Sequence, residues 1–333
     1  LEQGLLIDPL NPVSSYNLAL AFKHAGDHER AEQLLLRLTY LPEPPWMAYS
    51  GLARLYDDTG RLDKALHWIK RLGLASASSV TGNYGAFLAG RYEHLGLTED
   101  ADYWVSDAMA RTPQPTQRFL YKTIQGQIRG DPQGVKEEID KLHAVLGTDM
   151  SALQGGQATA YARANIFVGN FDVGINVLER VFDLESISEV SDLDNMFGLG
   201  AVHLLAYAYQ QVGRDDEAIE LLNRLHEQLN SYVVEQKMDY APLHHLRALN
   251  SGLRGDFDAA ADALEAAIKA GWLQYIWVMS NPAWTETIAD PRVARLLEDV
   301  KVDLERQRAV VEQADAEHDF RAELEAMRSA PGE

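Results

Sequence analysis

One pattern of small and apolar residues recurs along this chain about every 34 residues, and it constrains the fold more than any other feature. Around residue 50 the pattern consists of Leu52, Ala53 and Tyr56, then Gly60, then Ala65 and Ile69. One repeat earlier the matching residues are Leu18, Ala19, Phe22, Gly26, Ala31 and Leu35. One repeat later they are Leu88, Ala89, Tyr92, Gly96, Ala101 and Val105. Three matches in register predict a tandem array of one structural unit.

The spacing predicts two antiparallel helices in each unit. Ala53 and Ala65 are small, as expected where two helices cross closely, and Gly60 has the backbone freedom that a turn between them requires. One such pair cannot bury its own apolar face, so neighbouring pairs must stack on it. The array should therefore be a solenoid in which each pair is stabilised by the next.

The pattern resembles the tetratricopeptide repeat (TPR), a helix–turn–helix unit. The resemblance implies an all-α, TPR-type α-solenoid, a right-handed superhelix of antiparallel helix pairs. The pattern is clear again at Val202, Leu205, Ala206, Tyr209, Gly213, Ala218 and Leu222. It is weaker at 115–147, where Val135 replaces the small alanine and Gly126 stands in place of an aromatic residue, yet two helices are still expected there.

The repeats predict three segments. Residues 1–147 should hold the end of a truncated repeat and four helix pairs, and residues 148–271 three more pairs. An acidic insertion is expected at 185–195, and the first helix of the last pair is expected to begin near Tyr232. Residues 272–333 should form a capping segment and a long amphipathic helix. Because the chain begins at Leu1 and not at Met, we expect it to be a fragment of a longer protein.

The carboxyl-terminal segment is rich in aromatic residues, with Trp272, Trp277 and Trp284 expected to seal the last repeat. No Gly or Pro interrupts the stretch from Val293 to Ser329, which predicts one long helix, although its apolar spacing slips at His318. This helix could lie back along the array. The alternative is that it projects beyond Leu304 and forms a homodimer with a second copy.

The acidic composition limits the kinds of molecule that this chain is expected to bind. The net charge is −20 and the sequence pI is near 4.9, which argues against nucleic-acid binding or contact with an anionic membrane by this segment. A cationic or neutral partner fits better. No apolar run is long enough to predict membrane insertion. The absence of Cys removes disulfides and thiolate chemistry but leaves the compartment open.

The TPR resemblance also implies where a partner would bind, because first helices of such arrays line a concave groove. The candidate peptide-binding residues are Tyr16, Leu20, Lys23, Arg54, Asp57, Asp58, Glu93, Ile124, Arg163, Phe167, His203, Tyr207, Gln210 and His245. Their mixed character, apolar in the middle, favours an apolar or amphipathic peptide. The alternative is that the apolar members only pack against a neighbouring helix.

Two further features of the groove can be read from the sequence. Tyr16 and Leu20 stand where co-chaperone TPR domains carry the first Lys and Asn of a carboxylate clamp, so a co-chaperone function is not expected. Whether Lys23, Arg54 and Arg163 act together depends on the superhelical pitch. That pitch cannot be obtained from the sequence.

No catalytic or metal-binding pattern is present. There is no phosphate-binding loop of the Walker type, no GxSxG and no HExxH. His24 and His28 flank the predicted turn at Gly26, and the adjacent His244 and His245 point to different sides of a helix. We therefore expect no enzymatic activity, no metal and no cofactor.

The carboxyl-terminal block carries a second resemblance. Ala270-Gly271-Trp272 followed by Asp290-Pro291-Arg292-Val293 resembles the end of the TPR regions that follow winged-helix, cyclase or kinase output domains in bacterial one-component regulators. It implies a non-enzymatic protein- or peptide-binding module that is the sensory or interaction segment of a larger regulator. The alternative is a stand-alone scaffold for an envelope or secretion complex. The compartment would be periplasmic for a membrane-tethered parent and cytoplasmic otherwise.

Overall fold

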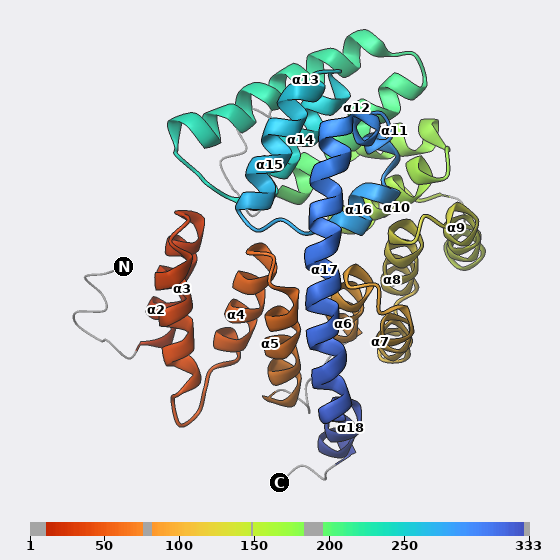
Figure 1. Ribbon diagram of the computed structural model, residues 1–333. Coiled ribbons are helices and arrows are strands. Elements are labelled where there is room, and N and C mark those ends of the chain that lie inside the picture. Colours follow the sequence, from red (N-terminus) through yellow and green to blue (C-terminus); the bar gives the residue numbers. More distant parts are fainter. Residues whose placement is uncertain (1–10, 76–81, 148, 183–195, 330–333) are drawn as a thin grey trace.

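The computed structural model describes residues 11–75, 82–147, 149–182 and 196–329. Within these ranges all regular secondary structure is helical (Figure 1). Consecutive helices form antiparallel pairs that stack side by side, so the prediction of an all-α solenoid is confirmed. The predicted acidic insertion at 185–195 lies outside the described residues.

Each pair has a first and a second helix. The first helices are α2 (Pro12–His24), α4 (Trp46–Asp58), α6 (Gly82–His94), α8 (Pro115–Ile128), α10 (Gly155–Phe167), α12 (Met196–Gln211) and α14 (Ala241–Leu253). The second helices are α3 (His28–Thr39), α5 (Leu62–Ala75), α7 (Thr98–Ala110), α9 (Pro132–Leu146), α11 (Phe171–Val181), α13 (Asp215–Asn230) and α15 (Phe257–Lys269).

Small residues lie where the two helices of a pair cross. In the pair α4–α5, Ala65 is fully buried and Ala53 is 6% exposed, which leaves room for a close approach. Gly60 joins these helices with a φ of 70°, a conformation that costs glycine little and other residues more. The pattern that predicted the array thus corresponds to the crossing points and turns of the structure.

The last pair begins later than expected. Residues of η4 (Ser231–Glu235) continue α13 as a short π-helix, and α14 starts only at Ala241. The prediction of a first helix beginning near Tyr232 was therefore wrong. Pro242 belongs in the first turn of a helix and not in its interior, and Lys237 takes a positive φ of 53° that separates the two helices.

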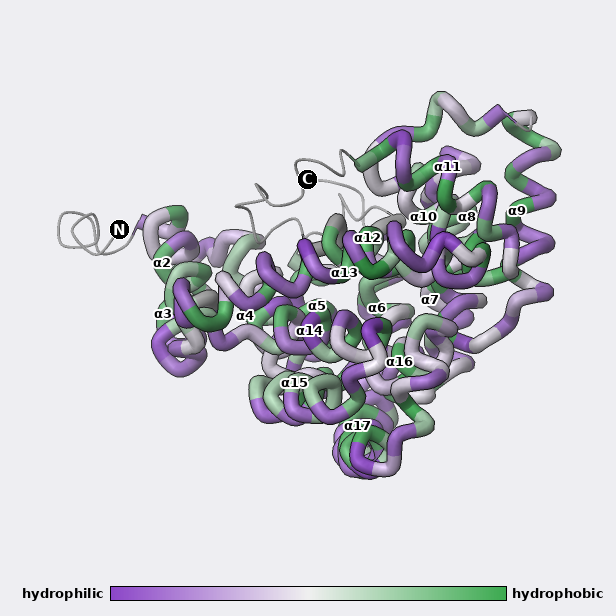
Figure 2. The backbone as a smooth tube through the Cα atoms, turned by 90° about the horizontal axis from the view of Figure 1, so that it is seen from above, coloured by the Kyte–Doolittle hydropathy of each residue, from purple (hydrophilic) through white to green (hydrophobic). Residues whose placement is uncertain are grey.

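After α15 the chain forms a cap and then runs back across the array. Its elements are α16 (Tyr275–Ser280), η5 (Pro282–Trp284), η6 (Thr287–Ala289), α17 (Pro291–Glu317) and α18 (Phe320–Ser329). Figure 1 shows α17 running from the α15 side of the molecule toward α5. Figure 2, turned by 90°, shows α17 nearly end-on beside α15 and α16. The helix therefore packs on its own chain through buried Val293, Leu297, Val300 and Leu304.

The long helix ends earlier than predicted. Its apolar spacing slips at His318, and there the backbone becomes extended, with φ −144° and ψ 113°. Asp319 then caps α18 by accepting a hydrogen bond from the backbone N–H of Ala322 (3.0 Å). The break lets Phe320 pack against Trp104, with ring centroids 5.8 Å apart. The prediction of one uninterrupted helix from Val293 to Ser329 was therefore wrong.

The turn of the second helix pair meets the end of the last pair at two glycines. A Cβ atom on Gly60 would lie 2.2 Å from the carbonyl oxygen of Gly271, so only glycine permits this backbone contact. Gln307 of α17 fixes the junction, because its Nε2 donates to Gly60 O (2.7 Å) and its Oε1 accepts from Asp63 N (3.3 Å). One apolar core accordingly joins α5, α6 and α7 with α14, α15, α17 and α18.

We expect Gln307→Ala to lower the free energy of unfolding by about 2 kcal/mol, because it leaves the Gly60 carbonyl and the Asp63 amide without their partners. Urea unfolding followed by circular dichroism measures the change. Gln313→Ala is the matched control, since Gln313 is exposed on the same helix and its side chain bonds to Glu317 alone among the described residues. An equal loss of unfolding free energy in both variants would show that Gln307 does not stabilise the contact between Gly60 and Gly271.

Candidate functional site

All the predicted groove residues lie on first helices, from α2 through α14. We call the surface that these helices share the first-helix wall. The structure separates its residues into groups with different surroundings. Each group is held by contacts within this chain, and those contacts decide which part of the wall is accessible.

A ladder of ion pairs connects neighbouring first helices in the amino-terminal half. Lys23 pairs with Asp58 (2.5 Å), Asp57 pairs with Arg91, and Glu93 accepts two hydrogen bonds from Arg129 (2.6 and 2.9 Å). Lys23 and Glu93 are almost fully buried, so solvent screens these pairs little. The ladder sets the register of α2, α4, α6 and α8 with respect to one another.

Four of the predicted residues come together around Tyr240, at the start of α14. The Lys23 ammonium lies 5.5 Å from the centroid of the Tyr240 ring. Burial raises the pKa of Tyr240, and the negative charge of Asp58 raises it further. The positive charge of Arg54 lowers this pKa, and the negative charge of Asp57 raises it. We call these five residues the Tyr240 cluster. Lys23 and Arg54 therefore share one electrostatic environment, which the sequence could not establish.

Arg163 lies elsewhere, under the cap. Its guanidinium is 5.1 Å from the centroid of the Trp277 ring on α16, a cation–π geometry. Burial lowers the pKa of Arg163 to about 10, and no carboxylate among the described residues pairs with it. Because α16 also contacts α6 and α8, this chain's own cap covers part of the first-helix wall.

His245 is enclosed by the cap as well. Its ring stacks between Trp272 (5.0 Å, 15°) and Trp284 (5.2 Å, 22°). Burial, and then the nearby His203, lower the pKa of His245 to about 3. Burial likewise lowers the pKa of His203 to about 4, although its Nδ1 is bonded to Leu199 O (2.8 Å). Both imidazoles are therefore neutral at pH 7.

The remaining predicted residues are packed or half-buried. The Gln210 side chain donates to Leu253 O (2.8 Å), and the Tyr207 ring meets Phe171 edge-on at 6.2 Å. Phe167 packs against the core of the carboxyl-terminal pairs, and Tyr16 against that of the first pairs. Leu20 and Ile124 are half-buried on α2 and α8.

An accessible place on the wall was missed by the sequence interpretation. Gly90 follows the crossing residue Ala89 just as Arg54 follows Ala53 in the preceding pair, and a Cβ atom on Gly90 would meet nothing within 4 Å. Phe87, one turn earlier on α6, is 56% exposed. The sequence shows that Gly90 occupies the same repeat position as Arg54. Because glycine has no side chain to contact a partner, it was not among the candidate residues.

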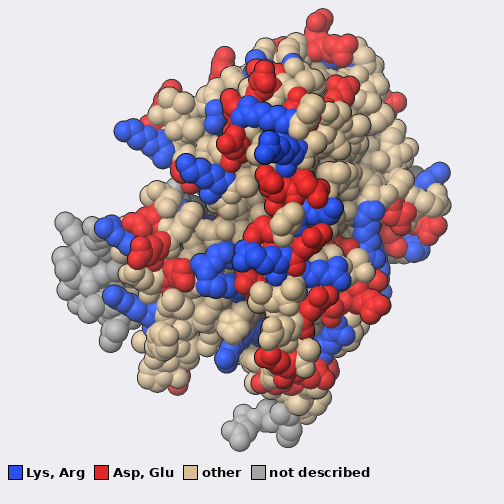
Figure 3. Space-filling view, in the orientation of Figure 1, with Lys and Arg blue, Asp and Glu red and all other residues tan. Residues whose placement is uncertain are grey.

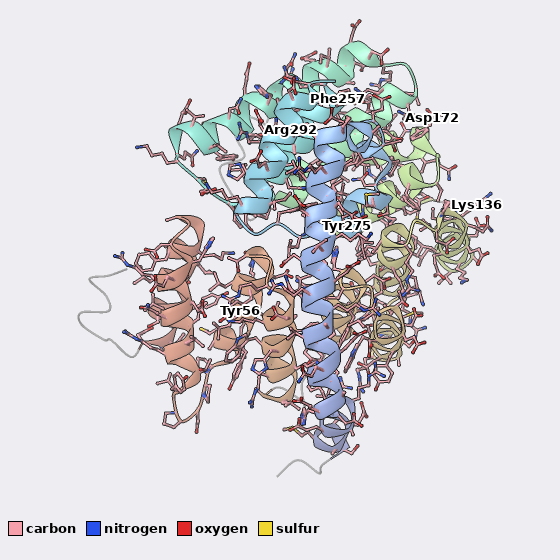
Figure 4. All side chains as sticks on the ribbon, in the orientation of Figure 1. Tyr56, Lys136, Asp172, Phe257, Tyr275 and Arg292 are labelled. Atoms are coloured by element: carbon pink, nitrogen blue, oxygen red, sulfur yellow. The ribbon has the colours of Figure 1, made fainter. Side chains whose placement is uncertain are left out.

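Charge is distributed evenly over the surface in view. Figure 3 shows Lys and Arg side chains interspersed with Asp and Glu, without a broad area of one sign on this face. In Figure 4, the labelled Tyr275 of α16 lies near α17, in the middle of the molecule. The described residues contain no group of three His, Asp or Glu placed to hold a metal ion. None of the described helices is both long and apolar enough to cross a bilayer.

Comparison with known proteins identifies one repeat directly. Residues 201–229, which span most of α12 and α13, match the family model described as tetratricopeptide repeat. No curated protein sequence matches the chain. The chain therefore carries a TPR unit within an array of like helix pairs.

Solved structures show distant likeness. The chain is similar to the crystal structure of the APC/C hetero-tetramer Cut9–Hcn1, with 13% identity, a TM-score of 0.44, and coverage of 89% of this chain and 50% of that one. It thus spans about half the length of that relative. A tetratricopeptide repeat protein from Parabacteroides merdae ATCC 43184 has 16% identity and a TM-score of 0.42, with coverage of 87% and 99%. The P58(IPK) TPR domain has 11% identity and a TM-score of 0.27, with coverage of 96% and 97%.

The lowered pKa values of His203 and His245 predict a stability that falls with acid. Unfolded, their pKa is about 6.5, whereas folded it is about 4 for His203 and about 3 for His245. The unfolded chain therefore binds more protons as the pH falls below 6.5, and stability that is complete at pH 7 is lost on the way to pH 4. In His245→Phe, the slope of unfolding free energy against pH should fall by about 1.4 kcal/mol per pH unit between pH 6 and 5. Urea titrations at several pH values measure it, and an unchanged slope would contradict it.

The open position at Gly90 predicts opposite effects for two glycines of α6. Gly90→Ala should raise the free energy of unfolding by about 0.5–1 kcal/mol, because alanine favours the helix and its methyl group meets no atom. Gly85→Ala should lower it by about 1–3 kcal/mol, since the new Cβ would lie 2.8 Å from Trp104 O. Urea unfolding compares the two. A loss of stability in Gly90→Ala would show that this part of the wall is not open.

Proposed function

Since the chain carries a tetratricopeptide repeat within a solenoid of like helix pairs, we propose that it is a protein-binding module whose partner docks on the first-helix wall at Gly90. Repeat solenoids use extended surfaces of this kind to bind other proteins. The observation that carries the proposal is the empty space over Gly90, flanked by exposed Phe87.

The surroundings of Gly90 suit a peptide. Exposed Arg54 lies at the equivalent position of α4, and half-buried Ile124 lies at the equivalent position of α8. A peptide crossing these three helices would meet a cation, a bare backbone and an aliphatic side chain in turn. The ion-pair ladder holds the helices beneath it in register, so little ordering entropy is lost on binding.

The cap limits where the partner can bind. Trp277 covers Arg163, and the tryptophans around His245 occupy the wall near α14. Phe167, His203, Tyr207, Gln210 and His245 then act in this proposal as supports of the wall. Tyr16, Leu20 and the members of the Tyr240 cluster other than Arg54 border the accessible part. The resemblance of the carboxyl-terminal block further supports a role as the interaction segment of a larger bacterial regulator.

The partner can be identified by crosslinking. The chain is used as bait in extracts of its source, with photoreactive groups beside Arg54 and Phe87. Crosslinked partner segments are mapped by mass spectrometry and synthesised as peptides for affinity measurement. Capture of an output domain or its regulator would support the regulatory role, and capture of envelope or secretion components would support a scaffold instead.

We expect Gly90→Trp to weaken binding of the mapped peptide at least tenfold, because the indole would fill the empty space while the fold has room for it. Ala144→Trp, on the exposed surface of the second helix α9, is the matched control and should bind like the parent. Circular dichroism and melting temperature confirm that both variants fold. Equal affinity of the parent and Gly90→Trp would overturn the proposed docking place.

A further inference from the structure

A cavity of about 200 Å³ lies between α13, α14 and α15, and none of the candidate groove residues lines it. It is lined by His226, Leu229, Arg247, Asn250, Ser251, Ala259, Asp262 and Ala263. We propose that this cavity binds a small carboxylate that also carries an adjacent N–H or O–H donor, the class of α-amino and α-hydroxy acids. This inference is independent of the protein-binding function.

Arg247 gives one side of the cavity a positive charge, which favours an anionic ligand. Arg247 is half-buried and makes no hydrogen bond or ion pair with the rest of the described chain. Burial lowers its pKa. A guanidinium removed from water without a counter-ion is costly, and a planar carboxylate matches its donors.

His226 belongs to the same side. Its Nε2 accepts from the Asn230 side chain (2.8 Å), which leaves the ring proton on Nδ1 as a donor. Burial lowers the pKa of His226, and the charges of Arg254 and Arg247 lower it further. The imidazole is thus a neutral donor near two cations, Arg254 and Arg247, whose effect on its pKa is opposed by the carboxylates of Asp256 and Glu227.

Asn250 favours a ligand that carries a hydrogen-bond donor. Asn250 is 1% exposed, and its Nδ2 donates to Leu222 O (3.0 Å), which fixes the orientation of the amide. Its Oδ1 is buried and has no hydrogen-bond partner among the described residues. An unmet buried acceptor is unfavourable, so a ligand that donates an N–H or O–H here gains affinity.

The other residues that line the cavity limit the size of a ligand. Ala259 and Ala263 are small, and they leave the space between α13 and α15 unfilled. Asp262 is held at the rim by Arg292 (2.5 Å), which is labelled in Figure 4 near the start of α17. The volume suits a molecule of a few non-hydrogen atoms and is below the range of larger ligands.

Isothermal titration calorimetry of the whole chain tests the inference. The probes are L-alanine, L-serine and L-lactate, with propionate lacking the donor and L-alaninamide lacking the carboxylate. We expect saturable binding of at least one of the first three at millimolar concentration or below, and at least tenfold weaker binding of propionate and L-alaninamide. Failure of all three to bind at 10 mM would overturn the proposal, and so would equal binding of propionate.

Variants locate the site. Arg247→Gln should weaken the bound probe at least tenfold, the effect of losing one charge-assisted hydrogen bond. Ala259→Leu should also weaken it, because the larger side chain occupies the cavity. The matched control Arg224→Gln removes the same charge from α13 outside the cavity and should change the affinity less than threefold. Equal effects of Arg247→Gln and Arg224→Gln would show that the probe binds elsewhere.

Discussion

The contact between Gly60 and Gly271 is the constraint on which the rest of the structure depends. Neighbouring pairs of a solenoid stabilise one another locally, but here the turn of the second pair meets the end of the last one. Gln307 bonds to the same turn and brings α17 with it. The second and third pairs are thereby joined with the last pair and the cap into one core spanning α5 to α7 and α14 to α18.

That junction explains how the cap comes to cover its own first-helix wall. Once α15 ends beside Gly60, the following residues pass over α6 and α8, and Trp277 reaches Arg163. The same course encloses His245 between two tryptophans. The proposed docking place at Gly90 lies on a part of the wall that is open, since a Cβ atom there would meet nothing within 4 Å.

Ion pairs connect neighbouring first helices of the array. In a protein with 30 basic and 50 acidic residues, each Lys or Arg can readily find a carboxylate, and the ladder of Lys23, Arg91 and Arg129 shows how such pairs fix neighbouring helices. Arg163 and Arg247 depart from this use. The first is covered by the Trp277 ring, and the second lines the cavity between α13, α14 and α15.

The sequence by itself determined the all-helical solenoid, because small residues at crossings and glycines at turns are local requirements that repeat with the unit. It also placed every candidate residue on a first helix. Only the tertiary structure decided that Lys23 and Arg54 meet Tyr240 while Arg163 meets Trp277, since these contacts depend on superhelical curvature summed over many repeats. It likewise decided that α17 folds back and breaks at His318, because the packing of Phe320 on Trp104 joins residues more than 200 positions apart.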